Sequence, residues 1–219
     1  MSYNIAIDGP AGAGKSTIAK TLAKNLGFIY VDTGAMYRCI ALKMLRMNIK
    51  LDEEDKIKEL LENTDIELKR EDDVIRVLLD GEDVTKEIRT TPVNEIVSQV
   101  SSIKIIRIKM VELQRAMKEK ADNIVMEGRD ITTVVFPDAD VKVYLTASLE
   151  ERTRRRYEEL KESNKDLTYE DVKKNIIARD ENDMKKEMGA LKVADGAVVI
   201  DNTNLSIEET YLAIKELIK

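Results

Sequence analysis

Residues 5–17 read IAIDGPAGAGKST: a short apolar run, a glycine-rich loop and the first residues of a helix. Ile18, Leu22 and Leu26 continue at helical spacing, so strand, loop and amphipathic helix follow one another directly. In that context the spacing Gly9-x-x-x-x-Gly14-Lys15-Ser16 is the Walker A pattern. A plain glycine-rich turn is the alternative interpretation.

The chemistry of this loop favours a triphosphate ligand. Glycines let the backbone curl until its N–H groups point at phosphate oxygens, and the helix N-terminus adds partial positive charge. Lys15 can reach the β- and γ-phosphates, and the Ser16 hydroxyl can ligate Mg²⁺. The loop therefore predicts binding of a nucleoside triphosphate with magnesium.

Five short apolar runs predict strands, at residues 5–7, 28–31, 124–126, 141–145 and 197–200. Stretches with helical spacing separate most of them, which predicts an α/β fold with a parallel sheet covered on both faces. Near the end of the chain, Ser206 and Glu209 form a capping-box pattern that starts a helix. We expect its stripe of Ile207, Tyr211, Ile214 and Ile218 to pack on the sheet.

Two stretches break the alternation. Residues 65–85 read as a hairpin-like pair of strands followed by an LDG turn, as a small β insertion would. Residues 150–188 are densely charged at helical spacing, which predicts a solvated helix pair or a mobile arm over a site.

Composition excludes several functions. The chain has 219 residues and no histidine, so hydrolysis through a Ser-His-Asp or Cys-His arrangement is excluded. The net charge of −6 argues against nucleic-acid binding through a basic face. No apolar run approaches a membrane span and the N-terminus does not read as a secretion signal. The single cysteine, Cys39, fits a small buried helix residue and a reducing cytoplasm, so we expect a cytoplasmic protein.

Arginines follow the predicted strand ends. Arg38 lies one helical turn past the second strand, and Arg129 lies at the tip of the third. Arg179 and Asp183 share one helix face, with Lys186 three residues beyond. Because parallel strands end at one edge, where the Walker loop also lies, these cations predict an anion site. The guanine-reading NKxD sequence of GTPases is absent, and no clear Walker B acid is present, which favours a transferase over a switch.

The sequence resembles the bacterial cytidylate kinases over nearly its whole length. The resemblance rests on IAIDGPAGAGKST, DTGAMYR, DGEDVTKEIRT, VSQVS, GRDITTVVFPDADVKVYLTAS, RDENDMKK and VIDNTNLSIEE. It implies a three-layer P-loop kinase fold with a five-stranded parallel sheet and helices on both faces. It further implies one kinase domain over residues 1–219, with a monophosphate-binding insert at 39–106 and a helical lid at 150–170.

The resemblance also implies the activity: transfer of the γ-phosphoryl group of ATP, with Mg²⁺, to CMP or dCMP, by a protein expected to be a monomer. The donor loop would comprise Gly9, Pro10, Ala11, Gly12, Ala13, Gly14, Lys15, Ser16 and Thr17. The catalytic residues would be Lys15, Arg38, Arg129 and the lid arginines Arg154 and Arg156. The acceptor would be bound by Arg38, Ser98, Arg107, Arg129, Asp130, Arg179, Asp183 and Lys186.

Within this set, Arg38 and Arg129 would bind the acceptor phosphate, and Arg179 and Asp183 the ribose hydroxyls. Ser98, Arg107 and Asp130 would read the cytosine edge, since its exocyclic amine suits a carboxylate whereas uracil presents a carbonyl. Two interpretations of Glu127 remain. It either contacts Lys15 or the water molecules around Mg²⁺, or it belongs to a structural salt bridge.

The chain departs from the family in three places. Residues 189–191 read GAL where the family usually has APL. Lys186 stands where arginine is usual, which keeps the charge but loses the bidentate fork. Thr132 stands where glycine is common, and only local backbone consequences are expected. Alternatives remain: a kinase of the same fold for UMP, AMP, shikimate or dephospho-coenzyme A, an ATP-hydrolysing switch, or an inactive relative.

Overall fold

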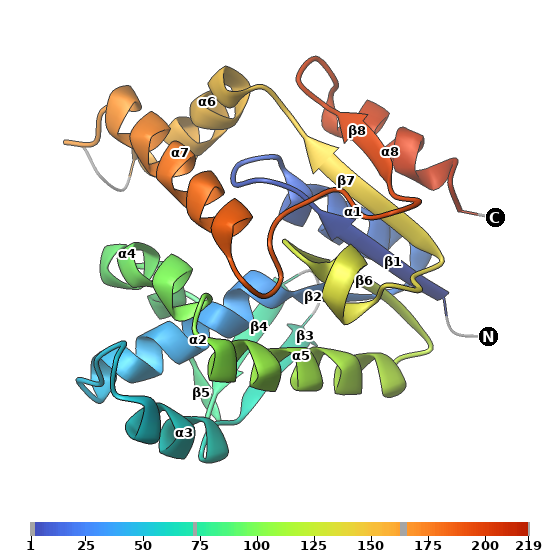
Figure 1. Ribbon diagram of the computed structural model, residues 1–219. Coiled ribbons are helices and arrows are strands. Elements are labelled where there is room, and N and C mark those ends of the chain that lie inside the picture. The colour runs from blue at the N-terminus through green and yellow to red at the C-terminus, as the bar shows by residue number, and fades with distance from the viewer. Residues whose placement is uncertain (1–2, 72–73, 163–165, 219) are drawn as a thin grey trace. The chain divides into compact units, whose positions relative to one another are not determined.

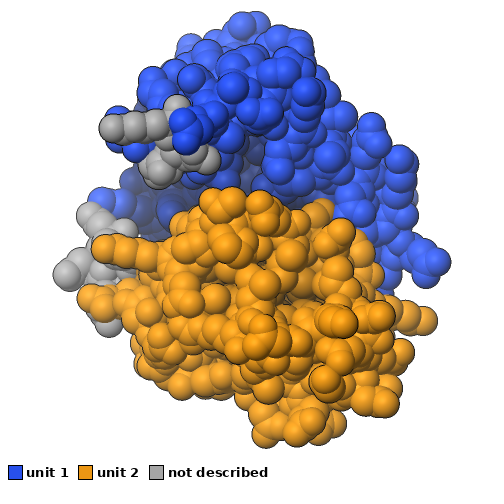
Figure 2. Space-filling view, turned by 90° about the vertical axis from the view of Figure 1, so that its left-hand side faces the viewer, with its two compact units in different colours: residues 1–31, 117–219 blue, residues 32–116 orange. Residues whose placement is uncertain are grey.

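The structure is a computed structural model that describes residues 3–71, 74–162 and 166–218 (Figure 1). The chain divides into two compact units, residues 1–31 with 117–219 and residues 32–116, which Figure 2 shows in different colours. Strand β2 (Ile29–Asp32) ends at the first boundary, and helix α5 (Lys104–Glu119) crosses the second.

The first unit is built on a five-stranded sheet in the order β2-β6-β1-β7-β8. Its other strands are β1 (Tyr3–Asp8), β6 (Asn123–Gly128), β7 (Val141–Thr146) and β8 (Val198–Asp201). The pairs β1–β6, β1–β7 and β7–β8 are parallel, and each of the five apolar runs forms a strand. Continuous apolar runs suit strands covered on both faces, so the predicted α/β class with a five-stranded parallel sheet is confirmed.

Helices surround this sheet (Figure 1). Helix α1 (Lys15–Leu26) packs on β1 and β6 and against α8 (Ile207–Lys215), and α6 (Leu149–Leu160) packs against α7 (Tyr169–Lys185). A short π-helical turn, η2 (Ile131–Val135), follows β6 and contacts β1. Among the described residues, no helix is both long and apolar enough to cross a membrane.

The predicted start of the last helix is confirmed, but its apolar stripe is partly wrong. Ser206 and Glu209 form a capping box, and Tyr211 and Ile214 are buried. Ile207, the first residue of α8, is 57% exposed. Ile218 lies past the helix, which ends at Lys215.

The second unit combines helices with a small antiparallel sheet. Its helices are α2 (Thr33–Arg46), α3 (Glu54–Glu62), the 3-10 turn η1 (Glu87–Arg89), α4 (Thr91–Val100) and most of α5. Strands β3 (Ile66–Glu71), β4 (Val74–Leu79) and β5 (Glu82–Asp83) form the sheet, so the hairpin expected at 65–85 is confirmed.

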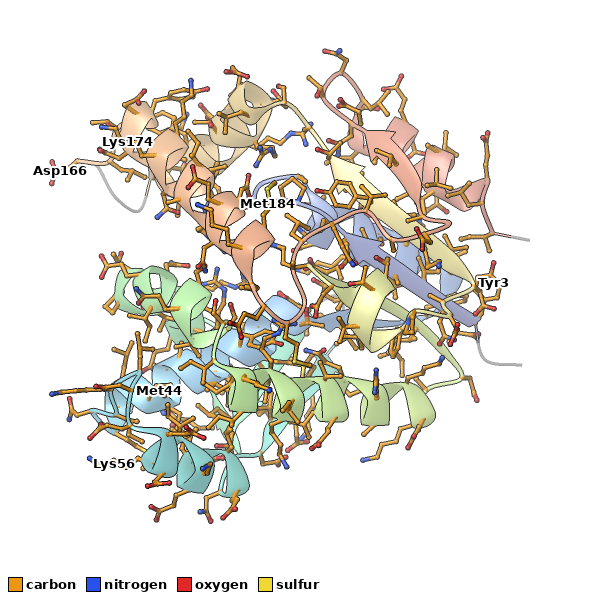
Figure 3. The ribbon with its side chains drawn as sticks, in the orientation of Figure 1. Tyr3, Met44, Lys56, Asp166, Lys174 and Met184 are labelled. Carbon is orange, nitrogen blue, oxygen red and sulfur yellow. The ribbon has the colours of Figure 1, made fainter. Side chains whose placement is uncertain are left out.

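The core of the second unit lies around α2, which packs against α3, α4 and η1. Met44 of α2, labelled in Figure 3, is fully buried. Cys39 is buried as well, which raises the pKa of its thiol to about 12 and makes it unreactive at neutral pH. The boundaries 39–106 and 150–170 stay predictions, and residues 163–165 of the expected lid lie outside the described residues.

Candidate active site

The glycine-rich loop leaves the carboxyl end of β1, the central strand, and leads into α1. A Cβ atom at Gly9 would lie 2.0 Å from the carbonyl oxygen of Leu145, so only glycine fits there. Gly12 has φ +78° and would place a Cβ 3.0 Å from the carbonyl oxygen of Arg152. The loop is therefore closely backed by β7 and α6, and its glycines permit the tight backbone path of a phosphate cradle.

Lys15 lies at the base of this cradle. Its side chain is buried, and its Nζ donates a hydrogen bond to the Pro10 carbonyl oxygen over 2.8 Å. Burial lowers the pKa of Lys15 to about 7, and the charge of Arg129 acts in the same direction, against the carboxylates of Glu127 and Asp8. The surroundings therefore destabilise the charged form of Lys15, and an anionic ligand would stabilise it.

Ser16 and Glu127 form the oxygen-rich side of the loop. The Ser16 hydroxyl donates to Glu127 Oε1 over 2.5 Å, and the Tyr30 hydroxyl donates to the same oxygen over 3.1 Å. No group of three or more acidic, histidine or cysteine side chains that could hold a metal occurs in the described part of the chain. A hydroxyl and one carboxylate nevertheless fit Mg²⁺, which takes one or two protein oxygens and completes its shell with phosphates and water.

The end of β6 places a second cation next to the loop, because Glu127 and Gly128 pair in register with Ile7 and Asp8 of β1. Arg129 follows at once, and its Nε donates to Asp183 Oδ2 on α7 over 2.8 Å. Burial alone would lower the pKa of Arg129, but Asp183 raises it. Arg129 is therefore a fixed positive charge within electrostatic reach of Lys15.

Three predicted acceptor residues come together on the last turns of α7. Lys186 Nζ donates to Asp183 Oδ1 over 2.7 Å. Asp183 is buried, whereas its neighbour Met184, labelled in Figure 3, is 55% exposed. Burial would raise the pKa of Asp183, but Arg129 and Lys186 outweigh it and lower that pKa to about 2. Arg179 carries a buried Nε with no hydrogen-bond partner among the described residues, and burial and Arg129 lower its pKa to about 10.

Asp130 is buried and begins η2, where its carbonyl oxygen accepts from the Val134 N–H over 2.8 Å. The turn is fixed from β1 by the Asp8 carboxylate, which accepts from the N–H groups of Ile131 and Thr132 and from the Thr132 hydroxyl over 2.8, 2.7 and 2.5 Å. The expectation that Thr132 has only backbone consequences is therefore wrong: its hydroxyl completes the binding of a buried carboxylate. Burial raises the pKa of Asp8 in spite of these bonds.

The second unit carries the remaining predicted acceptor residues, each described within that unit. Arg38 Nη1 donates to the side-chain oxygen of Asn94 and, over 3.4 Å, to the Ile88 carbonyl oxygen. Arg107 is almost fully buried, 5.9 Å from the centre of the Tyr37 ring, and donates to the Ser101 carbonyl oxygen. Ser98 is half-buried on α4, one helical turn before Ser101.

The lid arginines face different surroundings. Arg154 pairs with Glu151 and its side chain is 60% exposed. Arg156 pairs with Glu159 over 2.6 Å, and its positive charge contributes to the lowered pKa of Arg179. Their assignment to the transferred phosphate stays a prediction.

Two arginines of α6 that the sequence did not single out are linked to the loop, one directly and one through Asn202. Arg152 Nη1 donates to the Ala11 carbonyl oxygen over 3.0 Å. Arg155 donates to Asn202, whose amide nitrogen donates to the Ala13 carbonyl oxygen over 3.1 Å. Asp180, next to Arg179, was not singled out either. Its role depends on a contact with Ala11, which is distant in the sequence, so no local pattern marks it.

A Walker loop after the central strand of a five-stranded parallel sheet, with a second cation at the neighbouring strand end, defines a P-loop kinase. A model of the family described as cytidylate kinase matches residues 5–219. The cytidylate kinase of Caldicellulosiruptor saccharolyticus is 53% identical over 214 residues, 98% of this chain and 94% of its own. That of Caldanaerobacter subterraneus is 52% identical over 219 residues, 100% of this chain and 96% of its own. The chain belongs to the cytidylate kinase family.

The crystal structure of an uncharacterised protein from Eubacterium ventriosum is similar to this fold. Its TM-score is 0.55 at 14% identity, covering 99% of this chain and 98% of that one. At this identity the likeness concerns the fold alone.

Proposed function

We propose that the protein transfers the γ-phosphoryl group of ATP to CMP or dCMP, giving ADP and CDP or dCDP. The observation that carries the proposal is the convergence of Lys15, Arg129 and Arg179 at the carboxyl ends of β1 and β6 and on α7. Lys15 and Arg179 have lowered pKa values in these surroundings, so their charged forms gain from anionic ligands, and two phosphate groups supply such anions. Membership of the cytidylate kinase family identifies the acceptor.

The chemistry needs no general base. The attacking atom is a phosphate oxygen of the acceptor that is already ionised, which agrees with a chain without histidine. Catalysis then consists of positioning and charge neutralisation, with Lys15 and the loop N–H groups on the donor and Arg129 on the acceptor phosphate. Mg²⁺, held through Ser16 and reached by Glu127, would neutralise charge on the donor phosphates.

The remaining assignments are proposals of the same kind. Arg38 joins Arg129 on the acceptor phosphate, Arg179 and Asp183 hold the ribose, and Ser98, Arg107 and Asp130 read cytosine. Arg154 and Arg156 act from the lid. Lys186 supplies a point charge beside Asp183, a role that its 2.7 Å contact supports and that needs no guanidinium fork. A monomer in the cytoplasm, serving pyrimidine nucleotide metabolism, completes the proposal.

Release of ADP from MgATP tests it, with CMP, dCMP, UMP and AMP offered separately beside a sample without acceptor. Rapid turnover with CMP and dCMP alone is expected. Rapid turnover with UMP or AMP would instead identify a kinase of the same fold for another acceptor. Turnover that ignores the acceptor would favour an ATP-hydrolysing switch, with the donor loop interpreted correctly and the acceptor site wrongly.

A further inference from the structure

Both peptide groups of Ala11, in the donor loop, are bound by side chains from the helices α6 and α7. The Ala11 N–H donates to Asp180 Oδ1 of α7 over 3.0 Å, and its carbonyl oxygen accepts from Arg152 Nη1 of α6 over 3.0 Å. The same Arg152 nitrogen donates to Asp180 Oδ2 over 2.5 Å, so the three groups close a ring. The loop is thereby held at its tip by two charged residues that are themselves paired.

This ring is buried. Asp180 and Arg152 are 8% and 9% exposed, and Arg152 Nε also donates to the Ala147 carbonyl oxygen over 3.0 Å. The next loop residue, Gly12, approaches the backbone of Arg152 so closely that a Cβ atom would meet its carbonyl oxygen at 3.0 Å. Removing one partner of such a pair leaves the other charge buried and uncompensated, so the two side chains hold each other in place.

We propose that Asp180 and Arg152 form a positioning pair for the donor loop. By binding both sides of Ala11, the pair turns that N–H away from the cradle and sets the path of the chain from Gly12 into α1. The N–H groups of the first turn of α1, from Lys15 on, have no intrahelical partner and then face the triphosphate. The inference rests on the proposed function in one respect, that this loop binds ATP.

The pair also joins the loop to the acceptor residues of the same unit. Asp180 stands between Arg179 and Asp183 on α7, and Asp183 binds Arg129. The first turn of α6, around Arg152, and the part of α7 around Asp180 are therefore bonded directly to the donor loop.

The test is equilibrium binding of ATP by titration calorimetry, which does not depend on the acceptor. Asp180→Ala removes both contacts, and we expect the Kd for ATP to rise about tenfold or more, since each lost bond involves a charged group. Asp180→Asn keeps an oxygen for the Ala11 N–H but presents an amide to Arg152, and a rise of about three- to tenfold is expected. Glu181→Gln is the matched control, because Glu181 is exposed on the same helix and pairs with Lys185 on the surface.

A purely structural role would lower the melting temperature without changing the Kd for ATP of the folded protein. ATP binding by Asp180→Asn within twofold of the wild type, in samples folded by circular dichroism, would overturn the proposal. Should Asp180→Ala fail to fold, Asp180→Asn alone decides. Failure of the proposed acceptor would be visible separately, as normal ATP binding by the wild type without turnover of CMP.

Discussion

Arg129 at the end of β6 and Asp183 on α7 form a partly buried ion pair, with 2.8 Å between Nε and Oδ2. From the sequence, Arg129 was expected to bind the acceptor phosphate and Asp183 the ribose. In the structure each holds the other in place, and Lys186 supports the carboxylate from the far side. A ligand at this site would therefore meet an arranged group of charges.

This ion pair predicts how stability depends on pH. The pKa of Asp183 is lowered to about 2, below the ordinary value of 3.8, so its contribution is present above pH 4 and is lost as pH falls toward 2. We expect the free energy of unfolding of the wild type to exceed that of Asp183→Asn by ~2 kcal/mol at pH 5 and by about half of that at pH 3. Urea unfolding of both proteins measures this difference. A difference independent of pH would show that the pair contributes nothing through ionisation.

Lys15 predicts an opposite dependence for ATP binding. Its pKa of about 7 means that the ammonium form, which phosphates need, is present below pH 7 and is lost as pH rises. The Kd for MgATP should therefore rise by about tenfold between pH 7 and pH 8.5, with proton uptake on binding. Titration calorimetry in buffers of different ionisation enthalpy detects both effects. Lys15→Arg stays charged, so its Kd should vary little over that range, and a wild type that behaves like it would refute the prediction.

Asp130 predicts the choice of base. Asparagine in its place can present a donor to the carbonyl of uracil, whereas a carboxylate cannot. We expect Asp130→Asn to lower the ratio of kcat/KM for CMP to that for UMP by about ten- to a hundredfold, from a penalty of ~1–3 kcal/mol for unpaired groups. Steady-state kinetics with both nucleotides measure the ratio. Asp138→Asn, at an exposed position nearby, should leave it unchanged.

Thr132 predicts a stability effect specific to its hydroxyl. Thr132→Val keeps the branched side chain but leaves the buried Asp8 carboxylate with one donor fewer. We expect a loss of ~1–3 kcal/mol in the free energy of unfolding, measured by urea denaturation. Thr133→Val is the control, since the Thr133 hydroxyl makes a long bond of 3.4 Å to a backbone oxygen. Equal losses in both variants would mean that the Asp8 contact is unimportant.

The sheet and the donor loop could be predicted because their signals are local. Buried parallel strands need continuous apolar runs, and a phosphate cradle needs glycines at fixed spacing before a helix. The contacts that fix the loop are not local. The four arginines of residues 152–156 look alike in the sequence, and which of them faces the loop depends on how α6 is rotated. Ser148 caps α6, and the backbone of Arg152 lies directly against Gly12. Arg152 therefore bonds to the loop and Arg155 is linked to it through Asn202, whereas the Arg154 side chain is exposed.

The same limit applies to α7 and α8. Asp180 and Asp183 are both acidic helix residues, yet one binds Ala11 and the other Arg129, a distinction that only the packed structure contains. The stripe expected on α8 assumed a helix that continues to Ile218, but the regular helix ends at Lys215.

The capping box that begins α7 at Thr168 has a consequence for how the chain can change in length. Asp180 and Asp183 lie at fixed distances from that origin, so the helix serves as a ruler between its cap and the two carboxylates. One residue inserted between Thr168 and Arg179 would rotate all that follows by about 100°, which would carry Asp180 away from Ala11 and Asp183 away from Arg129 together. Insertions and deletions in this interval should therefore be rejected even where every functional residue is kept.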